Sequence, residues 1–268
     1  MPRRTRLDAE LVRRGLARSR EHASQLIADG RVTVRGTVAG KAATAVETDA
    51  AVVVRDLADD PDWASRGAHK LLGALEAFPI QVTGKRCLDA GASTGGFTDV
   101  LLRAGASEVV AADVGRGLLV WRLQTDDRVV VLDKTNVRAL TQEQTGGPVD
   151  LVVADLSFIS LRLVLPALLS CASADADLVP MVKPQFEVGK ERLGSGGVVR
   201  DHELRAEAVL TVLKSAGELG LRAHGVVASP LPGPSGNVEY FAWLRRGEPL
   251  ADDVATDLVN TAVREGPQ

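Results

Sequence analysis

The sequence predicts a two-domain α/β protein, in which a small basic α+β module precedes a large domain with a doubly wound, mostly parallel sheet. A glycine-rich turn lies between an apolar strand and a helix at residues 87–100. Four apolar runs follow it, and each ends at a polar residue. The first 41 residues hold ten Arg and Lys against four Asp and Glu, whereas the rest of the chain holds 22 against 31. Alternating strands and helices are typical of a parallel sheet covered by helices.

The basic module is expected at residues 1–59. The stretch RLDAELVRRG places apolar side chains on one helical face, and Gly15 ends that helix. Ser19 is expected to cap a second helix, which ends at Gly30. Short alternating strands follow around Val32–Val34, Val38 and Val52–Val54. The excess of positive charge indicates that this module binds a polyanion.

An acidic linker is expected at residues 60–65, and the large domain at 66–268. The linker contains Pro61 and one large aromatic residue, Trp63. An isolated tryptophan of this kind is typically a packing peg between domains.

Seven strands are expected in the large domain, at residues 87–89, 108–113, 128–133, 149–155, 177–183, 224–229 and 237–244. Helices are expected at 66–78, after the glycine turn, at 201–219 and at 251–264, and the glycine-rich segment 185–199 is expected to be a mobile loop over the site. The carboxyl ends of parallel strands share one edge of the sheet, where ligands bind. Four polar residues should therefore converge there: Asp113, Asp133, Asp155 and Lys183.

The glycine turn, DAGASTGGFT at residues 89–98, indicates which ligand it holds. A dinucleotide fingerprint requires glycine where Ser93 stands, and a P-loop requires lysine after Gly96. The turn therefore suits a ligand without phosphates. S-adenosylmethionine (SAM) fits, because its carboxylate can accept from free backbone amides while its cationic groups face Asp89. The alternative is a turn that only packs a helix against the sheet.

The candidate cofactor-binding residues lie in the turn and at the ends of the neighbouring strands. Asp113 is expected to accept the ribose hydroxyls, and Asp133 and Asn136 to read the adenine amino group. The full set is Asp89, Gly91, Ala92, Ser93, Gly95, Gly96, Phe97, Asp113, Asp133, Asn136 and Asp155.

Several motifs resemble known families. The front module is similar to the S4 RNA-binding domain, which implies RNA contacts by Arg4, Arg6, Arg18, Arg20 and Lys41. In the large domain, Lys70, Asp155, Lys183 and Glu239 match the Lys-Asp-Lys-Glu tetrad of FtsJ-like ribose 2′-O-methyltransferases, which have a Rossmann-like class I methyltransferase fold. With SRGAHKL, ADLSFIS, VKPQFEVG and GNVEYF, the whole chain resembles the TlyA family. The resemblance implies SAM-dependent methylation of cytidines in 16S and 23S ribosomal RNA (rRNA), on 30S and 50S subunits.

A ribose 2′-hydroxyl is a weak acid, so its methylation requires a positioned base. A lysine accepts a proton only when it is neutral, and partial burial near a second lysine favours that form. We therefore expect Lys183 to be the base and Lys70 to position the ribose. Asp155 and Glu239 would orient the two lysines.

The residue composition argues against a metal-binding or membrane-spanning protein. The four histidines and two cysteines form no metal-ligand pattern, and no apolar run reaches the about 18 residues of a membrane span. Without a signal peptide, the expectation is a cytoplasmic enzyme with no metal and no stable membrane insertion. Two alternatives stay open: a membrane-lytic haemolysin, the name also used in the resembling family, and an RNA-binding protein without catalysis.

Overall fold

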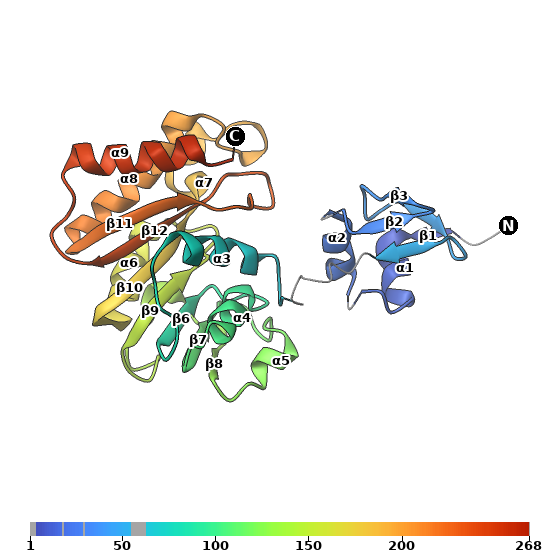
Figure 1. Ribbon diagram of the computed structural model, residues 1–268, viewed down its shortest axis with the longest axis horizontal. Coiled ribbons are helices and arrows are strands. Elements are labelled where there is room, and N and C mark those ends of the chain that lie inside the picture. Colours follow the sequence, from blue (N-terminus) through green and yellow to red (C-terminus); the bar gives the residue numbers. More distant parts are fainter. Residues whose placement is uncertain (1–3, 18, 29, 55–62, 268) are drawn as a thin grey trace. The chain divides into compact units, whose positions relative to one another are not determined.

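The computed structural model describes residues 4–17, 19–28, 30–54 and 63–267. The chain divides into two compact units, Met1–Asp62 and Trp63–Gln268, which are described separately (Figure 1). Arg18 and residues 60–62 of the expected linker lie outside the described residues.

The first unit packs two helices against two small antiparallel sheets, of order β1-β4 and β3-β2-β5. Its elements are β1 (Arg4–Arg6), α1 (Leu7–Arg13), α2 (Arg20–Ala28), β2 (Val32–Val34), β3 (Thr37–Val38), β4 (Ala45–Glu47) and β5 (Val52–Val54). Ser19 Oγ accepts from His22 N at 3.1 Å, as expected for a cap. The sequence did not indicate β1 and β4, because β1 reads Arg-Thr-Arg and β4 reads Ala-Val-Glu, so neither has the valine-rich pattern of the predicted strands.

The second unit has a seven-stranded sheet of order β11-β12-β10-β9-β6-β7-β8, which confirms the expected fold class. Five strands, β10, β9, β6, β7 and β8, are parallel, and β12 pairs antiparallel with β10 and β11. The strand order reverses between β6 and β9, which creates a crevice at their carboxyl ends. The strands are β6 (Arg86–Ala90), β7 (Glu108–Ala112), β8 (Val129–Leu132), β9 (Val149–Ala154), β10 (Ala172–Val182), β11 (Leu221–Ala228) and β12 (Tyr240–Arg246).

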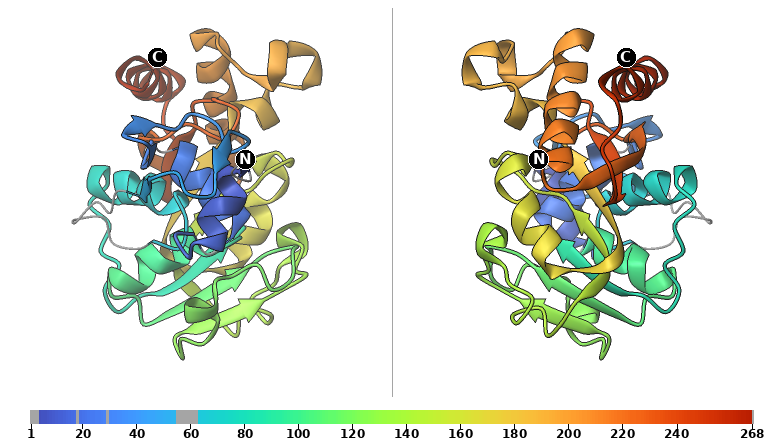
Figure 2. Two further views of the ribbon diagram at one scale, coloured as in Figure 1. Left: turned by 90° about the vertical axis from the view of Figure 1, so that its right-hand side faces the viewer. Right: turned by 90° about the vertical axis from the view of Figure 1, so that its left-hand side faces the viewer.

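Helices cover both faces of this sheet (Figure 2). One face packs against α3 (Gly67–Ala77), α4 (Gly96–Arg103) and α5 (Trp121–Gln124). The other packs against α6 (Leu165–Cys171), α8 (His202–Glu218) and α9 (Asp252–Glu265). Alternation along β12 places Phe241 on the first face and Tyr240 on the second.

The segment expected as a loop at 185–199 contains short helical turns. Pro184 opens α7 (Pro184–Glu187), and the 3₁₀ turns η3 (Lys190–Arg192) and η4 (Ser195–Gly197) follow. Proline favours a first helical position because it needs no hydrogen-bond acceptor there. Asn237 holds the end of the segment, accepting from Val199 N at 2.9 Å and donating to the Gly197 carbonyl at 3.0 Å.

Trp63 packs on its own unit. Its ring lies beneath the Arg103 guanidinium, 4.3 Å from the centroid, and Ala64 N donates to Asp99 Oδ2 at 2.9 Å. Arg103 and Asp99 belong to α4, the helix that follows the glycine turn. The start of the second unit is therefore fastened to that helix.

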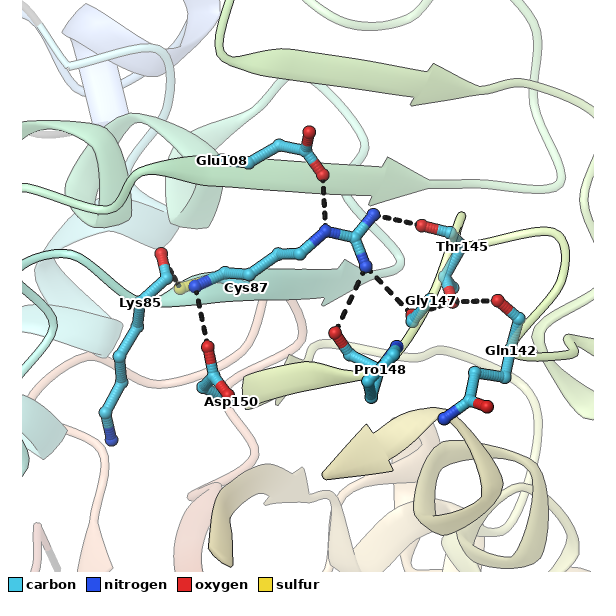
Figure 3. A network of polar contacts seen from close by, with 9 residues as sticks. Lys85, Cys87, Glu108, Gln142, Thr145, Gly147, Pro148 and Asp150 are labelled. Carbon is cyan, nitrogen blue, oxygen red and sulfur yellow. Dashed lines mark hydrogen bonds and ion pairs between the residues drawn. The ribbon is translucent and has the colours of Figure 1, made fainter. Parts of the chain in front are cut away.

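Arg86 joins the neighbouring strands β9, β6 and β7 at the sheet edge opposite the crevice. Its side chain donates to Glu108 Oε1 at 2.7 Å and to the carbonyls of Thr145, Gly147 and Pro148. Its backbone N donates to Asp150 Oδ2 at 3.1 Å. Figure 3 shows these partners, which come from the start of β7, from the turn leading into β9 and from β9 itself.

We predict that Arg86→Ala lowers the free energy of unfolding by about 2–3 kcal/mol, because several partly buried carbonyls lose their donor together. Urea denaturation of the purified protein measures this loss. Arg128→Ala is the matched control: Arg128 pairs with Asp126 and is half-exposed, so its loss should stay below about 1 kcal/mol. Equal losses in the two variants would contradict the structural role of Arg86.

Candidate active site

The carboxyl edge of the sheet brings the predicted tetrad together. Asp155 follows β9 and Lys183 follows β10, as expected. Because β12 runs antiparallel, its first residue lies at this same edge, where Tyr240 pairs with Val182. Glu239, just before β12, is therefore beside Lys183. The first turn of α3 brings Lys70 to the same place.

The four side chains form a linked set of ion pairs. Lys183 Nζ lies 2.6 Å from Asp155 Oδ1 and 4.0 Å from Glu239 Oε1. Lys70 Nζ donates to Glu239 Oε2 at 2.5 Å. The carboxylate of Glu239 thus faces both lysines, one with each oxygen.

Burial makes this pairing obligatory. Glu239 is fully buried, and Lys70 and Lys183 are both buried, at 8% and 7% exposure. An isolated buried charge costs several kcal/mol, whereas two lysines and two carboxylates neutralise one another. Glu239 also explains how a lysine is accommodated in the first turn of α3, where the helix dipole disfavours it. Only Asp155 is appreciably exposed, so the cluster opens to solvent on its side.

Two groups that the sequence did not indicate support Lys183 and its loop. Ser157 Oγ accepts from Lys183 Nζ at 3.1 Å. Glu187 in α7 accepts from Ser160 Oγ at 2.6 Å and from Leu161 N at 2.8 Å, and burial raises its pKa. Together they hold the loop after β9 against the helix after β10. Both residues lie within motifs noted in the sequence, but nothing in their spacing indicated a contact.

The turn at residues 230–236 forms a wall beside the cluster. A Cβ on Gly233 would lie 2.6 Å from Glu239 Oε1, and one on Gly73 would lie 2.8 Å from Pro230. The turn therefore packs closely on Glu239 and on α3. The absence of side chains at these two glycines permits that approach.

A cavity of about 380 Å³ lies beside the glycine turn, at the strand-order reversal. Apolar residues, including Val114, Leu118 and Leu156, form much of its wall. Among the predicted cofactor residues, those that line it are Gly91, Ser93, Asp113, Asn136 and Asp155. Asp155 thus belongs both to this cavity and to the ion-pair cluster.

The remaining predicted cofactor residues do not line the cavity. Phe97 packs on Phe241 with 5.9 Å between ring centroids, and Gly96 is in close contact with Ser65. Gly95 adopts φ +100°, and a Cβ there would clash with the side chains of Leu119 and Leu123, at and just before α5; Ala92 is buried. Asp133 is exposed and accepts from Gly117 N at 2.9 Å. These contacts shape the turn, and any direct role in cofactor binding stays a prediction.

Gly91 and Asp113 fix the turn from two sides. Gly91 adopts φ +87°, and a Cβ there would lie 2.5 Å from the Asp155 carbonyl. The Asp113 carboxylate accepts from Ser93 N at 2.9 Å and from Gly115 N at 2.7 Å. The turn is therefore held close to β9 and to the end of β7.

Asp89 is a buried acid behind the turn. Its Oδ2 accepts from Thr98 Oγ1 at 2.7 Å, while Oδ1 is buried with no hydrogen-bond partner among the described residues. Burial, and to a lesser degree the carboxylates of Asp155 and Asp113, raises the pKa of Asp89 from 3.8 to about 7. An unpaired buried carboxylate oxygen near an acid-lined cavity fits a cationic ligand. SAM, with its ammonium and sulfonium groups, has that chemistry.

The predicted RNA-contacting residues of the first unit are mostly exposed. Arg6 and Arg20 both pair with Asp8, and Arg4 pairs with Glu47. Lys41 is exposed, and Arg18 lies outside the described residues. Arg35, which was not among the predicted RNA contacts, shares Glu47 with Arg4.

We predict that Asp89→Asn removes a pH-dependent loss of stability. A carboxyl whose pKa is higher in the folded state than in the unfolded state destabilises the fold as pH rises from about 4 to about 7. In that window the stability of the wild type should fall relative to Asp89→Asn by up to about 1.4 kcal/mol per pH unit. Urea denaturation at pH 4.5, 6 and 7.5 measures the difference. A difference independent of pH would contradict the raised pKa.

Two family models match the chain. The FtsJ-like methyltransferase model covers residues 63–246, and the S4 domain model covers residues 5–52. A relative from Mycobacterium tuberculosis strain H37Rv, named 16S/23S rRNA (cytidine-2′-O)-methyltransferase TlyA, is 63% identical over 270 residues, covering 100% of both chains. Hemolysin A of Brachyspira hyodysenteriae is 36% identical, covering 88% of this chain and 98% of that relative.

A solved structure shows the same architecture. A chain described as a "putative hemolysin" from Streptococcus thermophilus superposes with a TM-score of 0.76 at 34% identity, covering 99% of this chain and 97% of that chain. The family models, the full-length identity and this superposition agree in domain order. The chain therefore belongs to the TlyA family, in which an S4 domain precedes an FtsJ-like methyltransferase domain.

Proposed function

We propose that this protein is a SAM-dependent rRNA methyltransferase that modifies the ribose 2′-hydroxyl of cytidine in 16S rRNA, 23S rRNA or both. The observation that carries the proposal is the convergence of Lys70, Asp155, Lys183 and Glu239 beside the cavity. The named activity of the relative at 63% identity supports it. A ribosomal substrate implies that the enzyme works in the cytoplasm, with 30S or 50S subunits as partners.

The cavity beside the glycine turn is the proposed SAM site. Asp113 and Asn136 would hold the adenosine part of SAM. Asp89 would compensate the positive charge of the SAM ammonium and sulfonium groups. SAM supplies an electrophilic methyl group on its sulfonium sulfur. Asp155 lies at the boundary between this cavity and the lysines, so the methyl acceptor would be held next to both.

Lys183 is the proposed proton acceptor for the 2′-hydroxyl. It can accept this proton only in its neutral form, so its own proton must first pass to solvent, to which the cluster opens on the Asp155 side. Asp155 and Ser157 both contact its Nζ, so they fix the direction in which this nitrogen approaches the substrate. Lys70 would donate a hydrogen bond to the ribose, and Glu239 holds both lysines in place. A reacting group fixed in this way avoids much of the entropic cost of bringing it to the substrate.

Phe158 is an exposed aromatic residue at the rim of the cavity. Its side chain is 91% exposed, its backbone adopts φ +63°, and its ring centroid lies 5.2 Å from that of Phe186. A left-handed conformation is unfavourable for phenylalanine, so the surrounding loop must hold it. Exposed aromatic rings stack on unpaired bases in RNA-binding proteins. We infer that the target nucleotide leaves its helix and that its base stacks on this pair.

A membrane-lytic activity remains the second candidate, because one relative is named Hemolysin A. No helix in the described part of the chain is long and apolar enough to cross a membrane. Leakage of a dye from liposomes, measured with purified protein, tests this candidate directly. Leakage that persists in Lys183→Ala would separate it from methyl transfer.

We predict that Lys183→Ala reduces methyl transfer from labelled SAM to purified 30S and 50S subunits by at least about 100-fold. SAM binding, measured by calorimetry, should remain, because Lys183 does not line the cavity. Lys183→Arg keeps the positive charge but cannot act as a base, so it should be equally inactive. Lys214→Ala, an exposed lysine on α8, is the matched control and should retain activity. Substantial activity in Lys183→Arg would assign Lys183 an electrostatic role instead.

For Phe158→Ala we expect KM for the ribosomal subunit to rise about tenfold or more, because base stacking contributes about 1–3 kcal/mol. Affinity for SAM should change less, since only part of the cavity wall is altered. Steady-state kinetics against subunit concentration provide the test. An unchanged KM would show that the base does not stack on this ring.

A further inference from the structure

Three carboxylates of the S4 unit each hold two arginines. Asp8 pairs with Arg6 and Arg20, Glu10 with Arg13 and Arg14, and Glu47 with Arg4 and Arg35. The basic surface expected from the sequence is therefore organised around acids.

Asp8 fixes its two arginines most completely. Arg6 donates from Nε and Nη2 to Oδ1 and Oδ2 at 3.1 and 2.9 Å, and Arg20 Nη2 donates to the same Oδ2 at 3.0 Å. Ala9 N donates to Oδ1 at 2.8 Å. Asp8 itself is buried, whereas the side chains of Arg6 and Arg20 are 51% and 61% exposed. Two guanidinium groups from different elements are thus held side by side with their outer edges open to solvent.

The other two acids are arranged differently. Arg14, which pairs with Glu10, also donates to the carbonyls of Ala50 and Thr48, at 2.7 and 3.0 Å. Its guanidinium is therefore used in contacts within the unit. Glu47 is partly exposed and accepts from Arg4 at only 3.4 Å. Of the three, only the Asp8 pair combines a buried, fully bonded acid with two open guanidinium groups.

We propose that Asp8 is a positioning residue that holds Arg6 and Arg20 as a two-arginine site for the backbone phosphates of the RNA substrate. This inference rests on the proposed function and names the phosphate-recognition element of its substrate binding. Without a carboxylate between them, two adjacent guanidinium groups repel each other and separate. With it, their remaining N–H groups are fixed in a geometry that suits bidentate contact with phosphate oxygens.

Replacing Asp8 by Asn should change the affinity for RNA in the direction opposite to that expected from net charge. Asp8→Asn makes the basic unit more positive, so charge alone should strengthen RNA binding and leave its dependence on salt unchanged or steeper. If Asp8 positions the arginines, the same variant should instead weaken binding. The Arg6 hydrogen bond lowers the pKa of Asp8 to about 2, so the carboxylate is ionised under any usual assay condition.

The test uses the full-length protein with purified ribosomal subunits. Asp8→Asn should raise KM for the subunit by about tenfold while kcat stays within twofold, because the altered contacts are made equally in ground and transition states. Asp49→Asn is the matched control: Asp49 is exposed in the same unit, and its loss changes the charge identically. This control should bind as tightly as the wild type or more tightly.

A double-mutant cycle separates positioning from folding. In an Arg6→Ala/Arg20→Ala background, Asp8→Asn should cause no further rise in KM, whereas a purely structural effect would persist there. Arg20→Lys keeps the positive charge but loses the planar guanidinium that can donate two parallel hydrogen bonds to a phosphate. It should therefore also weaken binding to the ribosomal subunit. The proposal is overturned if Asp8→Asn leaves KM unchanged or lowers it, or if its effect is the same in both backgrounds. If the wild type neither binds nor methylates either subunit, the proposed function itself fails.

Discussion

The ionic contact between Glu239 and the two lysines is the constraint on which the site depends. Glu239 has no solvent to stabilise its charge, so Lys70 and Lys183 must stay beside it. Lys70 comes from a helix before the first strand of the sheet, and Glu239 from the start of the last strand. The elements that bring these residues together therefore span almost the entire domain, and the cluster forms only when the sheet is complete.

The two ends of the strands have different roles: contacts that stabilise the sheet lie at one end, and the functional site lies at the other. At the edge opposite the crevice, Arg86 ties the starts of the central strands to the turn before β9. At the functional edge, polar groups are left for substrate, and the backbone adopts unfavourable conformations at Ser93 and Phe158. The functional edge also holds the cavity and the Asp89 oxygen that has no hydrogen-bond partner in the described part of the chain.

The two units use the same electrostatic device for different purposes. In the methyltransferase domain, carboxylates hold the two lysines to which we assign proton transfer and ribose positioning. In the S4 domain, Asp8 holds arginines, which remain charged and can act only through geometry. In both cases a buried acid fixes cationic side chains that would otherwise be flexible, which would reduce the entropy lost in the proposed binding of RNA.

The sequence by itself determined the fold class and the order of the domains, because apolar periodicity and glycine turns are local properties. The tetrad residues came from the resemblance of the motifs to those of FtsJ-like methyltransferases. The sequence also indicated that Asp155 and Lys183 end neighbouring strands. It did not indicate that Glu187 and Ser160 hold the loop after β9, or that Asp8 lies between Arg6 and Arg20. Those contacts join residues by the direction and burial of their side chains, which no spacing along the chain encodes. Only the packed tertiary structure decided them, because it fixes which polar groups lose water and must find one another.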